Sequence, residues 1–199
     1  MKNLITAILM TIVMTVLFGL IYPLVVTGLA QVIFPDKADG QLIKSTDGTL
    51  VGSALIGQPF SGQGYFHSRP SAVNAGGYST IATDAEGANS GGSNYGPTNR
   101  KLIDRVKSDV EKLETENPGQ LVPIELVTTS ASGLDPHISP AAAEFQVARV
   151  ARERGMSEGE LRSLVAAHTS GRQFGILGEP RVNVLELNLE LDRRMPLRK

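Results

Sequence analysis

Three histidines are the side chains in this sequence best suited to metal binding or acid–base chemistry. They are His67, His137 and His168, and no two of them have the four-residue helical spacing of a zinc site. A site assembled from the distant His67 and His137, with Asp135 beside the second, would belong to a hydrolase or a metal-dependent enzyme. The competing interpretation is ordinary hydrogen bonding within loops. Because ligand spacing is missing, we expect no metal site and no catalytic residue.

Other catalytic chemistries find less support. The sequence has no cysteine, which excludes disulfides, thiol catalysis and thiolate metal sites. It also lacks the GxSxG pattern that exposes a nucleophilic serine. Gly91-Gly92-Ser93 has backbone N–H groups that can bind an anion, but the Lys-Ser/Thr ending of a P-loop is absent, so a structural turn is the alternative. The net charge of −1 argues against a nucleic-acid partner.

The candidate residues lie in loops. Between Gln58 and Asn99 the sequence is rich in Gly, Pro, Ser and Asn, and such long loops in a compact domain are usually functional or disordered. Aromatic residues and arginine favour an ordered docking surface. Together with the turn-rich segment Ser130–Pro140, this loop supplies the residues that we expect at an interface with a partner: Tyr65, His67, Arg69, Ser93, Asn94, Asn99, Asp135 and His137.

Helices and strands must position these loops. Apolar spacing and capping residues predict a helix from Thr98 or Asn99 to Asn117, a helix over Ala141–Arg154 between Ser139 and Gly155, and a helix that starts with the Ser157–Glu160 capping box and ends at His168. Runs of apolar residues predict strands at Leu50–Ile56, Leu121–Thr128 and Val182–Leu191. This order indicates one mixed α/β (α+β) domain.

The first stretch of the chain decides the class of protein. From Leu4 to Ile33 no side chain is charged, and a helix of about 30 residues is about 45 Å long, more than a bilayer core of about 30 Å. The alternatives are a cleaved signal peptide, whose apolar core is shorter, and a buried helix, which would show a polar face. We expect an uncleaved transmembrane helix over about residues 7–30, so that residues 1–35 form the anchor and residues 36–199 the domain.

The anchor also carries a pattern of helix association. Thr11, Thr15 and Gly19 are spaced four apart, which lets a second helix approach closely, although such residues also occur on lipid-facing surfaces. Pro23 is expected to kink the helix or end its regular part. Lys2 is the only charged side chain before the span, so charge marks the orientation weakly. We favour a cytoplasmic N-terminus and an extracytoplasmic domain.

Five long motifs are distinctive. One is the anchor with IYPLVVTG, and the others are YFHSRPSA, SGGSNYGPTNR, DPHISPAAAEFQVARVA and HTSGRQFGILGEPRVNVLELNLELD. Together they resemble the C subunits of Kdp-type potassium-transporting ATPases, the KdpC family. The resemblance covers nearly the whole chain in order. It implies an accessory subunit in the bacterial inner membrane, whose partners are a channel-like potassium-binding subunit and a P-type ATPase subunit. Potassium would be carried by the complex rather than bound by this chain.

The resemblance further implies a catalytic chaperone that raises the affinity of the ATPase subunit for ATP in a ternary complex with nucleotide. The DKTGT motif that P-type pumps phosphorylate is absent, so this chain supplies no aspartyl phosphate. Gln146 is the candidate for nucleotide contact, and helix packing is its alternative role. An extracytoplasmic domain cannot touch cytoplasmic ATP, so the effect would then pass through the partners. The rival interpretations are a membrane-anchored extracytoplasmic enzyme using His67, Asp135 and His137, and a free-standing anchored binding protein.

Overall fold

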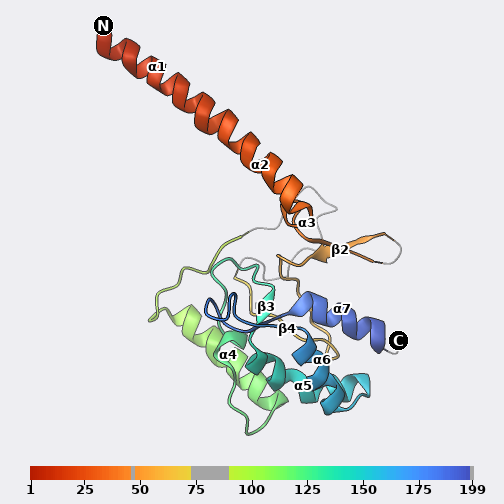
Figure 1. Ribbon diagram of the computed structural model, residues 1–199. Coiled ribbons are helices and arrows are strands. Elements are labelled where there is room, and N and C mark those ends of the chain that lie inside the picture. Colours follow the sequence, from red (N-terminus) through yellow and green to blue (C-terminus); the bar gives the residue numbers. More distant parts are fainter. Residues whose placement is uncertain (46–47, 73–89, 198–199) are drawn as a thin grey trace. The chain divides into compact units, whose positions relative to one another are not determined.

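The computed structural model describes residues 1–45, 48–72 and 90–197. Its chain falls into two compact units, Met1–Ile43 and Lys44–Lys199 (Figure 1). Residues 73–89 of the long loop expected between Gln58 and Asn99 lie outside the described residues.

The first unit is one long helix followed by a short one. Its elements are α1 (Lys2–Val16), the π-helical turn η1 (Leu17–Ile21), α2 (Tyr22–Ile33) and α3 (Pro35–Ala38). Lys2–Ile33 is a stretch of 32 residues with a mean hydropathy of 2.6 in its most apolar window, none of which is buried within the chain. This helix is long and apolar enough to cross a membrane, as the sequence predicted.

Pro23 interrupts the regular α-helix without ending it. A proline lacks the backbone N–H, and its ring collides with the carbonyl group four residues earlier, here that of Gly19. The turn Leu17–Ile21 takes the wider π geometry, in which hydrogen bonds reach one residue further, just before Pro23. The helix then continues as α2.

The described residues contain two small sheets. Strands β1 (Leu42–Lys44) and β2 (Leu50–Ser53) form the first of them. The other sheet has the order β3-β5-β4, and its antiparallel strands are β3 (His137–Ile138), β4 (Thr169–Ser170) and β5 (Arg181–Asn183). In its register His137 pairs with Asn183, and Thr169 pairs with Val182.

Helices surround this small sheet, and those within residues 100–116, 140–154 and 158–167 end where the sequence signals predict. They are α4 (Arg100–Glu116), the 3₁₀ turn η2 (Ile124–Leu126), α5 (Pro140–Arg154), α6 (Glu158–Ala167) and α7 (Val184–Arg194). The Ser139 side chain accepts a hydrogen bond from Ala142 N at the start of α5, and Gly155 ends it with a φ of 67°. Both hydrogen bonds of the capping box between Ser157 and Glu160 are present at α6.

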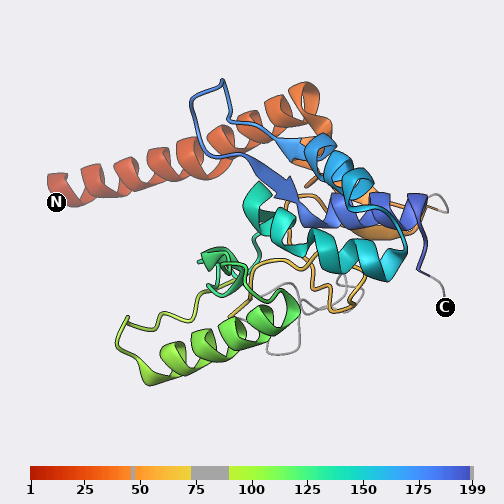
Figure 2. The ribbon, with the colours of Figure 1, turned by 90° about the horizontal axis from the view of Figure 1, so that it is seen from below.

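The core lies where α5, α6, α7 and β5 meet. Its apolar residues come mainly from these elements, and Phe66 joins them from the loop after β2. Figure 2 shows α4 along one side of the unit. None of its residues is fully buried, although Leu113 packs against the core. The expected α+β domain is confirmed, with less strand and more helix than predicted.

The strand expected over Val182–Leu191 is wrong beyond its first two residues. Asn183 caps α7 by accepting a hydrogen bond from Glu186 N, and the helix runs from Val184 to Arg194. The alternating leucines suggested a strand, yet Leu and Glu are strong helix formers. Val184, Leu187, Asn188 and Leu191 are buried, which is the helical spacing of three and four residues.

The other two expected strands also need correction. Leu121–Thr128 contains only the 3₁₀ turn Ile124–Leu126, and Leu121 and Ile124 are exposed at 96% and 77%. Pro123, directly before that turn, has no N–H to donate to a strand partner. Strand β2 ends at Ser53, because a turn follows it before Ile56.

Candidate functional site

Four long polar side chains hold the backbone of residues 63–67, at the start of the YFHSRPSA motif. They are Gln146, Arg149, Arg154 and Asn188, which we call the polar clamp. All four are at least 90% buried, and they come from α5 and α7. The clamp fixes a loop that makes no strand or helix of its own, so its order depends on tertiary contacts.

Gln146 uses its entire hydrogen-bonding capacity inside the protein. Its Oε1 accepts from His67 N at 2.7 Å and from Arg149 Nη2 at 2.7 Å. Its Nε2 donates to the carbonyl oxygens of His67 at 3.1 Å and Ala142 at 3.2 Å. A side-chain amide has two acceptor and two donor positions, and all four are taken. The packing role is therefore present, while nucleotide contact by Gln146 stays a prediction.

The two arginines of the clamp donate to carbonyl groups of the same loop. Arg149 Nη1 donates to the carbonyl oxygens of Gln63 and Tyr65, at 2.5 and 3.0 Å. Arg154 Nε donates to the carbonyl oxygen of Gly64 at 2.5 Å, and its guanidinium carbon lies 4.7 Å from the centre of the Tyr65 ring. Burial lowers the pKa of Arg149, and Glu116, 3.5 Å away, counteracts this.

Asn188 completes the clamp from α7. Its Oδ1 accepts from Phe66 N and its Nδ2 donates to the Phe66 carbonyl oxygen, both at 2.9 Å. Asp192, one turn further along α7, accepts from the Tyr65 hydroxyl at 3.0 Å and from Arg154 Nη2 at 2.9 Å. Burial, with help from the Asp192 carboxylate, raises the pKa of Tyr65. The aromatic residues of this motif are thus fixed by polar contacts from two helices.

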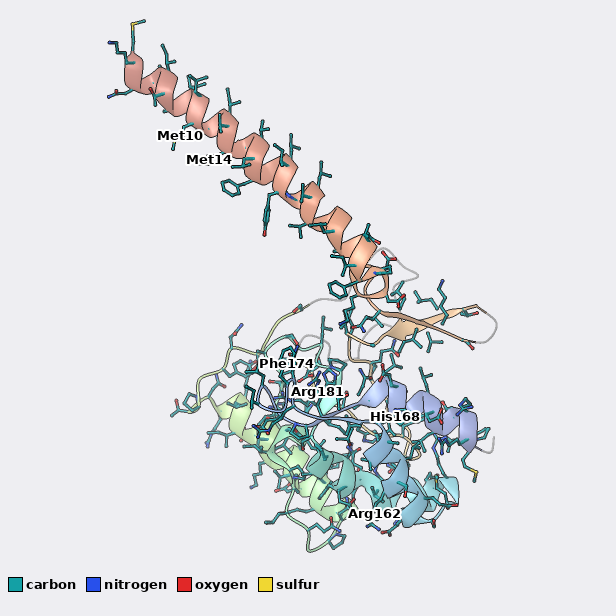
Figure 3. The ribbon with its side chains drawn as sticks, in the orientation of Figure 1. Met10, Met14, Arg162, His168, Phe174 and Arg181 are labelled. Carbon is teal, nitrogen blue, oxygen red and sulfur yellow. The ribbon has the colours of Figure 1, made fainter. Side chains whose placement is uncertain are left out.

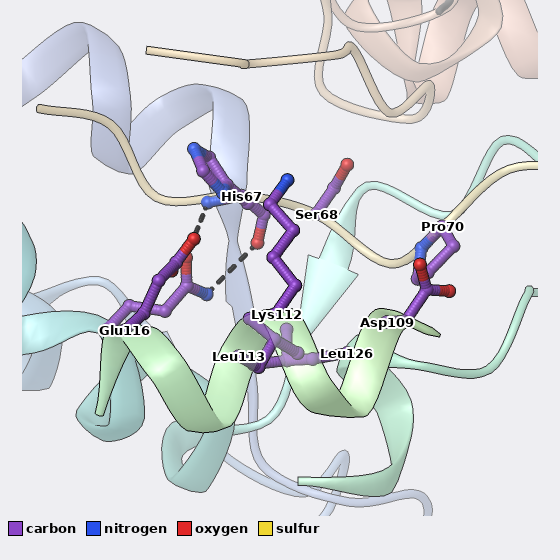
Figure 4. A pocket seen from close by; sticks show the side chains of 9 residues that line it. His67, Ser68, Pro70, Asp109, Lys112, Leu113, Glu116 and Leu126 are labelled. Carbon is purple, nitrogen blue, oxygen red and sulfur yellow. Dashed lines mark hydrogen bonds between the residues drawn. The ribbon is translucent and has the colours of Figure 1, made fainter. Parts of the chain in front are cut away.

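His67 lies in a small hollow between α4 and α5. Figure 4 shows this hollow of about 180 Å³, with side chains of α4 on one side and His67 above them. His67 Nε2 lies 3.1 Å from the Gly62 carbonyl oxygen, so this nitrogen carries a hydrogen and donates it. Burial lowers the pKa of His67, and the nearby charge of Arg149 lowers it further. Both effects favour the neutral form of the imidazole.

Asp135 and His137 belong to a different hollow of about 360 Å³, next to β3 and the end of the loop before β5. Arg69 Nη1 donates to Asp135 Oδ2 at 3.2 Å, and His137 Nδ1 lies 3.6 Å from Asp135 Oδ1. The hydrogen bond from His137, together with Arg69, lowers the pKa of Asp135. Arg69, Asp135 and His137 are thus brought together, and their role at an interface stays a prediction.

The three residues of the hypothetical enzyme site line two different hollows. His67 lines the first hollow, whereas Asp135 and His137 line the second. Within the described residues, no group of three His, Asp, Glu or Cys side chains is placed to hold a metal ion. This arrangement supports loops held by polar contacts, which was the competing interpretation of the histidines.

The glycine-rich segment before α4 is an irregular stretch that lies against residues 131 and 132. Gly91 N donates to the Ser132 carbonyl oxygen at 2.8 Å, so this amide is not available to an anion. A Cβ atom on Gly92 would lie 3.2 Å from the Ala131 carbonyl oxygen, which explains the glycine. Ser93 is half-buried, Asn94 is exposed, and Asn99 caps α4 by accepting from Lys101 N at 2.9 Å.

The anchor presents a shallow groove at the predicted packing stripe. Thr11, Thr15 and Gly19 line it, together with the larger side chains of Met10, Met14 and Phe18. Figure 3 shows Met10 and Met14 on this helix. The Thr11 hydroxyl donates to the Ala7 carbonyl oxygen at 2.9 Å, so it carries no unsatisfied donor into an apolar environment. Small residues framed by larger ones form a concave strip that a second helix can fill.

Fold and sites together define a class of protein. It is an α+β domain on one helix that fits a single membrane pass, and its buried polar side chains hold loops instead of gathering for a reaction. The profile of the family described as "K+-transporting ATPase, c chain" matches residues 4–193, and the chain belongs to this family, KdpC. It is thus a subunit of a potassium-transporting ATPase and not the catalytic chain of the pump.

Individual relatives agree with this assignment. The chain is 64% identical to the "Potassium-transporting ATPase KdpC subunit" of Koribacter versatilis, over 98% of this chain and 97% of the relative. It is 58% identical to the subunit of the same name from Rhodopseudomonas palustris, over 96% and 98%. The one from Bradyrhizobium diazoefficiens is 56% identical, over 94% of each chain.

Sequence reasoning missed most of the polar clamp. Arg149 and Arg154 occur at positions of α5 that look like an exposed charged face, and Asn188 lies in a segment expected to be a strand. No local signal indicates that these side chains turn inward, because their partners in residues 63–67 and on α7 are more than 35 residues away in the sequence.

Proposed function

We propose that this chain is the accessory subunit that stabilises assembly of a Kdp-type potassium pump. Its helix crosses the bacterial inner membrane against the channel-like potassium-binding subunit, and its domain, from about residue 36, lies on the extracytoplasmic side. The P-type ATPase subunit of the same complex performs ATP hydrolysis. Potassium is selected and carried by the partners and is not bound by this chain.

One observation carries this proposal: the groove of the anchor coincides with the small-residue stripe. Thr11, Thr15 and Gly19 line the same side of the helix. Within a bilayer no hydrophobic force drives helices together, so their association depends on close packing, which small residues allow. A partner helix gains close van der Waals contact along the groove.

The effect on ATP affinity is proposed to be indirect. The amide of Gln146 makes four internal hydrogen bonds, so binding a nucleotide there would break contacts that hold the loop of residues 63–67. An extracytoplasmic domain is also separated from cytoplasmic ATP. A change in ATP affinity at the ATPase subunit then arises as coupling energy between subunits. The full chain alone in detergent should show no saturable ATP binding by calorimetry, whereas micromolar binding would overturn the indirect route.

The assembly proposal is tested by co-purification. The tagged full chain is expressed with its neighbouring subunits, extracted in mild detergent and assayed for bound subunits and for potassium-stimulated ATP hydrolysis. Gly19→Leu fills the groove and should remove most of both. Val13→Leu, on the opposite side of the same helix, is the matched control and should retain both, because this residue does not line the groove.

The outcomes separate the alternatives. Recovery of large membrane subunits with potassium-stimulated ATP hydrolysis, lost in Gly19→Leu alone, supports the accessory subunit. A wild-type chain that purifies without partners and without this activity would favour the free-standing anchored protein. If Gly19→Leu and Val13→Leu lose bound subunits and ATP hydrolysis equally, the groove is not the surface that binds the partner helix.

A further inference from the structure

The loop between β4 and β5 exposes large apolar side chains at its tip. Phe174, Ile176 and Leu177 are exposed at 84%, 75% and 55%, and every residue from 171 to 180 is exposed. Figure 2 shows the loop projecting from the rest of the second unit, and Figure 3 labels Phe174 within it. We call residues 173–177 the hairpin tip. No other stretch of four described residues in the second unit exposes three large apolar side chains.

The backbone of the hairpin tip is fixed by its own hydrogen bonds. Gln173 N donates to the Leu177 carbonyl oxygen at 2.8 Å, and Leu177 N donates to the Gln173 carbonyl oxygen at 2.9 Å. Below them, Arg172 Nη2 donates to both carboxylate oxygens of Glu179, at 2.8 and 2.7 Å. The loop therefore presents its apolar side chains in one defined arrangement, which lowers the entropy lost when a partner binds.

The folded domain alone gives no reason for these residue types. Phe174 adopts a φ of 54°, in the left-handed region that glycine or asparagine occupies at less cost. Its side chain buries almost nothing in return. Exposed loops usually carry polar residues, and a rigid apolar projection of this kind marks an interaction site.

A charged hollow adjoins the hairpin tip. Glu179, Pro180 and Arg181 line the same hollow as Asp135 and His137, so one wall of it comes from the hairpin. Arg181 is exposed, and within the described residues it forms no ion pair, whereas Arg69 pairs with Asp135 and Arg172 with Glu179. The Glu125 carboxylate lines the same hollow and accepts a hydrogen bond from Ser139 N. An arginine that forms no ion pair within the described residues, next to an apolar projection, suits a surface that offers a carboxylate beside an apolar socket.

We propose that the hairpin tip inserts into an apolar socket on another subunit of the ATPase, and that a carboxylate at the rim of this socket pairs with Arg181. The inference deepens the proposed function, on which it rests, because it assigns an interface outside the membrane to the same assembly. Phenylalanine and arginine are enriched in the cores of protein interfaces, where shape and charge are matched together.

A protein surface suits the hairpin tip better than a lipid surface. Interfacial membrane binding favours Trp or Tyr at the headgroup level and clusters of Lys and Arg for anionic lipids. The loop from 171 to 180 contains neither Trp, Tyr nor Lys, and Glu179 neutralises Arg172. Two backbone hydrogen bonds between Gln173 and Leu177 keep the hairpin tip narrow, and a narrow projection fits a socket.

Photo-crosslinking in the assembled complex tests the proposal. A photoreactive phenylalanine analogue replaces Phe174 in the full chain, which is expressed with its partner subunits and irradiated in the membrane. The matched control carries the same analogue at Leu121, which is exposed at 96% in another loop of the same unit. We expect a covalent adduct with another subunit of the pump from position 174 and little or none from position 121.

A second pair of variants measures what the contact contributes. Phe174→Ser with Leu177→Ser should speed dissociation of the partner subunits in detergent about tenfold or more, as truncation at a central apolar contact does. Leu121→Ser with Ile124→Ser removes comparable exposed apolar side chains and should leave the rate unchanged. Equal melting temperatures of the two variants show that the domain is folded in both.

The results distinguish failure of the inference from failure of the proposed function. If the wild-type chain recovers no partner subunits, the proposed function fails first. If partners are recovered but position 174 reacts only with lipid, or with nothing, the hairpin tip is not a protein-binding element. Unchanged dissociation in the Phe174 and Leu177 double variant also overturns the inference.

Discussion

Asn188 shows how one buried polar side chain decides the shape of a loop. It is fully buried on α7, where a leucine would satisfy the helix pattern equally well. Its side-chain amide instead forms hydrogen bonds with the backbone N–H and carbonyl group of Phe66, 122 residues earlier in the chain. A buried backbone amide without a partner is costly, so the side chain and the loop depend on each other.

Replacing this amide should be among the most damaging single changes in the domain. Asn188→Ala leaves both polar groups of Phe66 without their partner and creates a small cavity, so the free energy of unfolding should fall by about 2–4 kcal/mol. Urea unfolding of the full chain in mild detergent measures it. Gln120→Ala, at an exposed position, is the control, and a loss below about 1 kcal/mol at Asn188 would contradict the role of the clamp.

His67 gives the domain a pH dependence with a definite sign. Burial holds its pKa below the ordinary value of 6.5 in the folded protein. Between these two pKa values the unfolded chain binds more protons, so stability rises with pH there and falls as pH is lowered through about 6.5. Below the folded pKa this group adds no further change.

The variant His67→Gln should remove this component and still donate to the Gly62 carbonyl group. Unfolding of wild type and variant is compared between about pH 7 and about pH 5, where the wild type should lose more stability. Contributions of other groups, such as Asp135, are common to both proteins and cancel. Parallel curves for the two proteins would show that His67 titrates normally.

At the scale of one element, α6 depends on its capping box. Ser157 Oγ accepts from Glu160 N at 3.2 Å, and Glu160 Oε2 accepts from Ser157 N at 3.1 Å. The hydrogen bonds from Ser157 also lower the pKa of Glu160. Since a helix of 10 residues is marginal by propensity alone, its first turn needs these contacts and the burial of Leu161 and Leu164.

Loss of the cap should therefore be measurable. Ser157→Ala removes the hydroxyl acceptor and should lower the free energy of unfolding by about 1 kcal/mol. Ser163→Ala is the matched control on the exposed face of the same helix, and it should be neutral or slightly stabilising, because alanine has the higher helix propensity. Equal effects of the two changes would argue against the cap. Thermal unfolding of wild type and both variants, followed by circular dichroism, measures these differences in stability.

At the scale of the whole molecule, the orientation across the membrane can be tested directly. The chain has no cysteine, so a single introduced thiol reports one position. Gln120→Cys lies at an exposed site of the second unit and Lys2→Cys at the N-terminus. With a membrane-impermeant maleimide and intact inner membranes, we expect labelling of Gln120→Cys only. Labelling of Lys2→Cys alone would reverse the proposed orientation.

What the sequence determined is local. The anchor follows from 30 uncharged residues in a row, and α5 and α6 follow from Ser139, Gly155 and Ser157, because capping and hydropathy act between neighbours in the chain. The family could also be predicted, because its motifs are long and contiguous. The small-residue stripe of the anchor could also be predicted, because residues spaced four apart lie about one helical turn apart on the same side of a helix.

Tertiary structure decided the rest. Residues 184–191 alternate well enough for a strand, and burial of one helical face in the hydrophobic core favours α7 instead. The roles of Gln146, Arg149 and Asn188 depend on contacts with residues 63–67, and the separation of His67 from Asp135 and His137 depends on the packing of two loops. These contacts join parts of the chain that are far apart in the sequence. Such contacts produce no local pattern of residue types, so the sequence alone does not predict them.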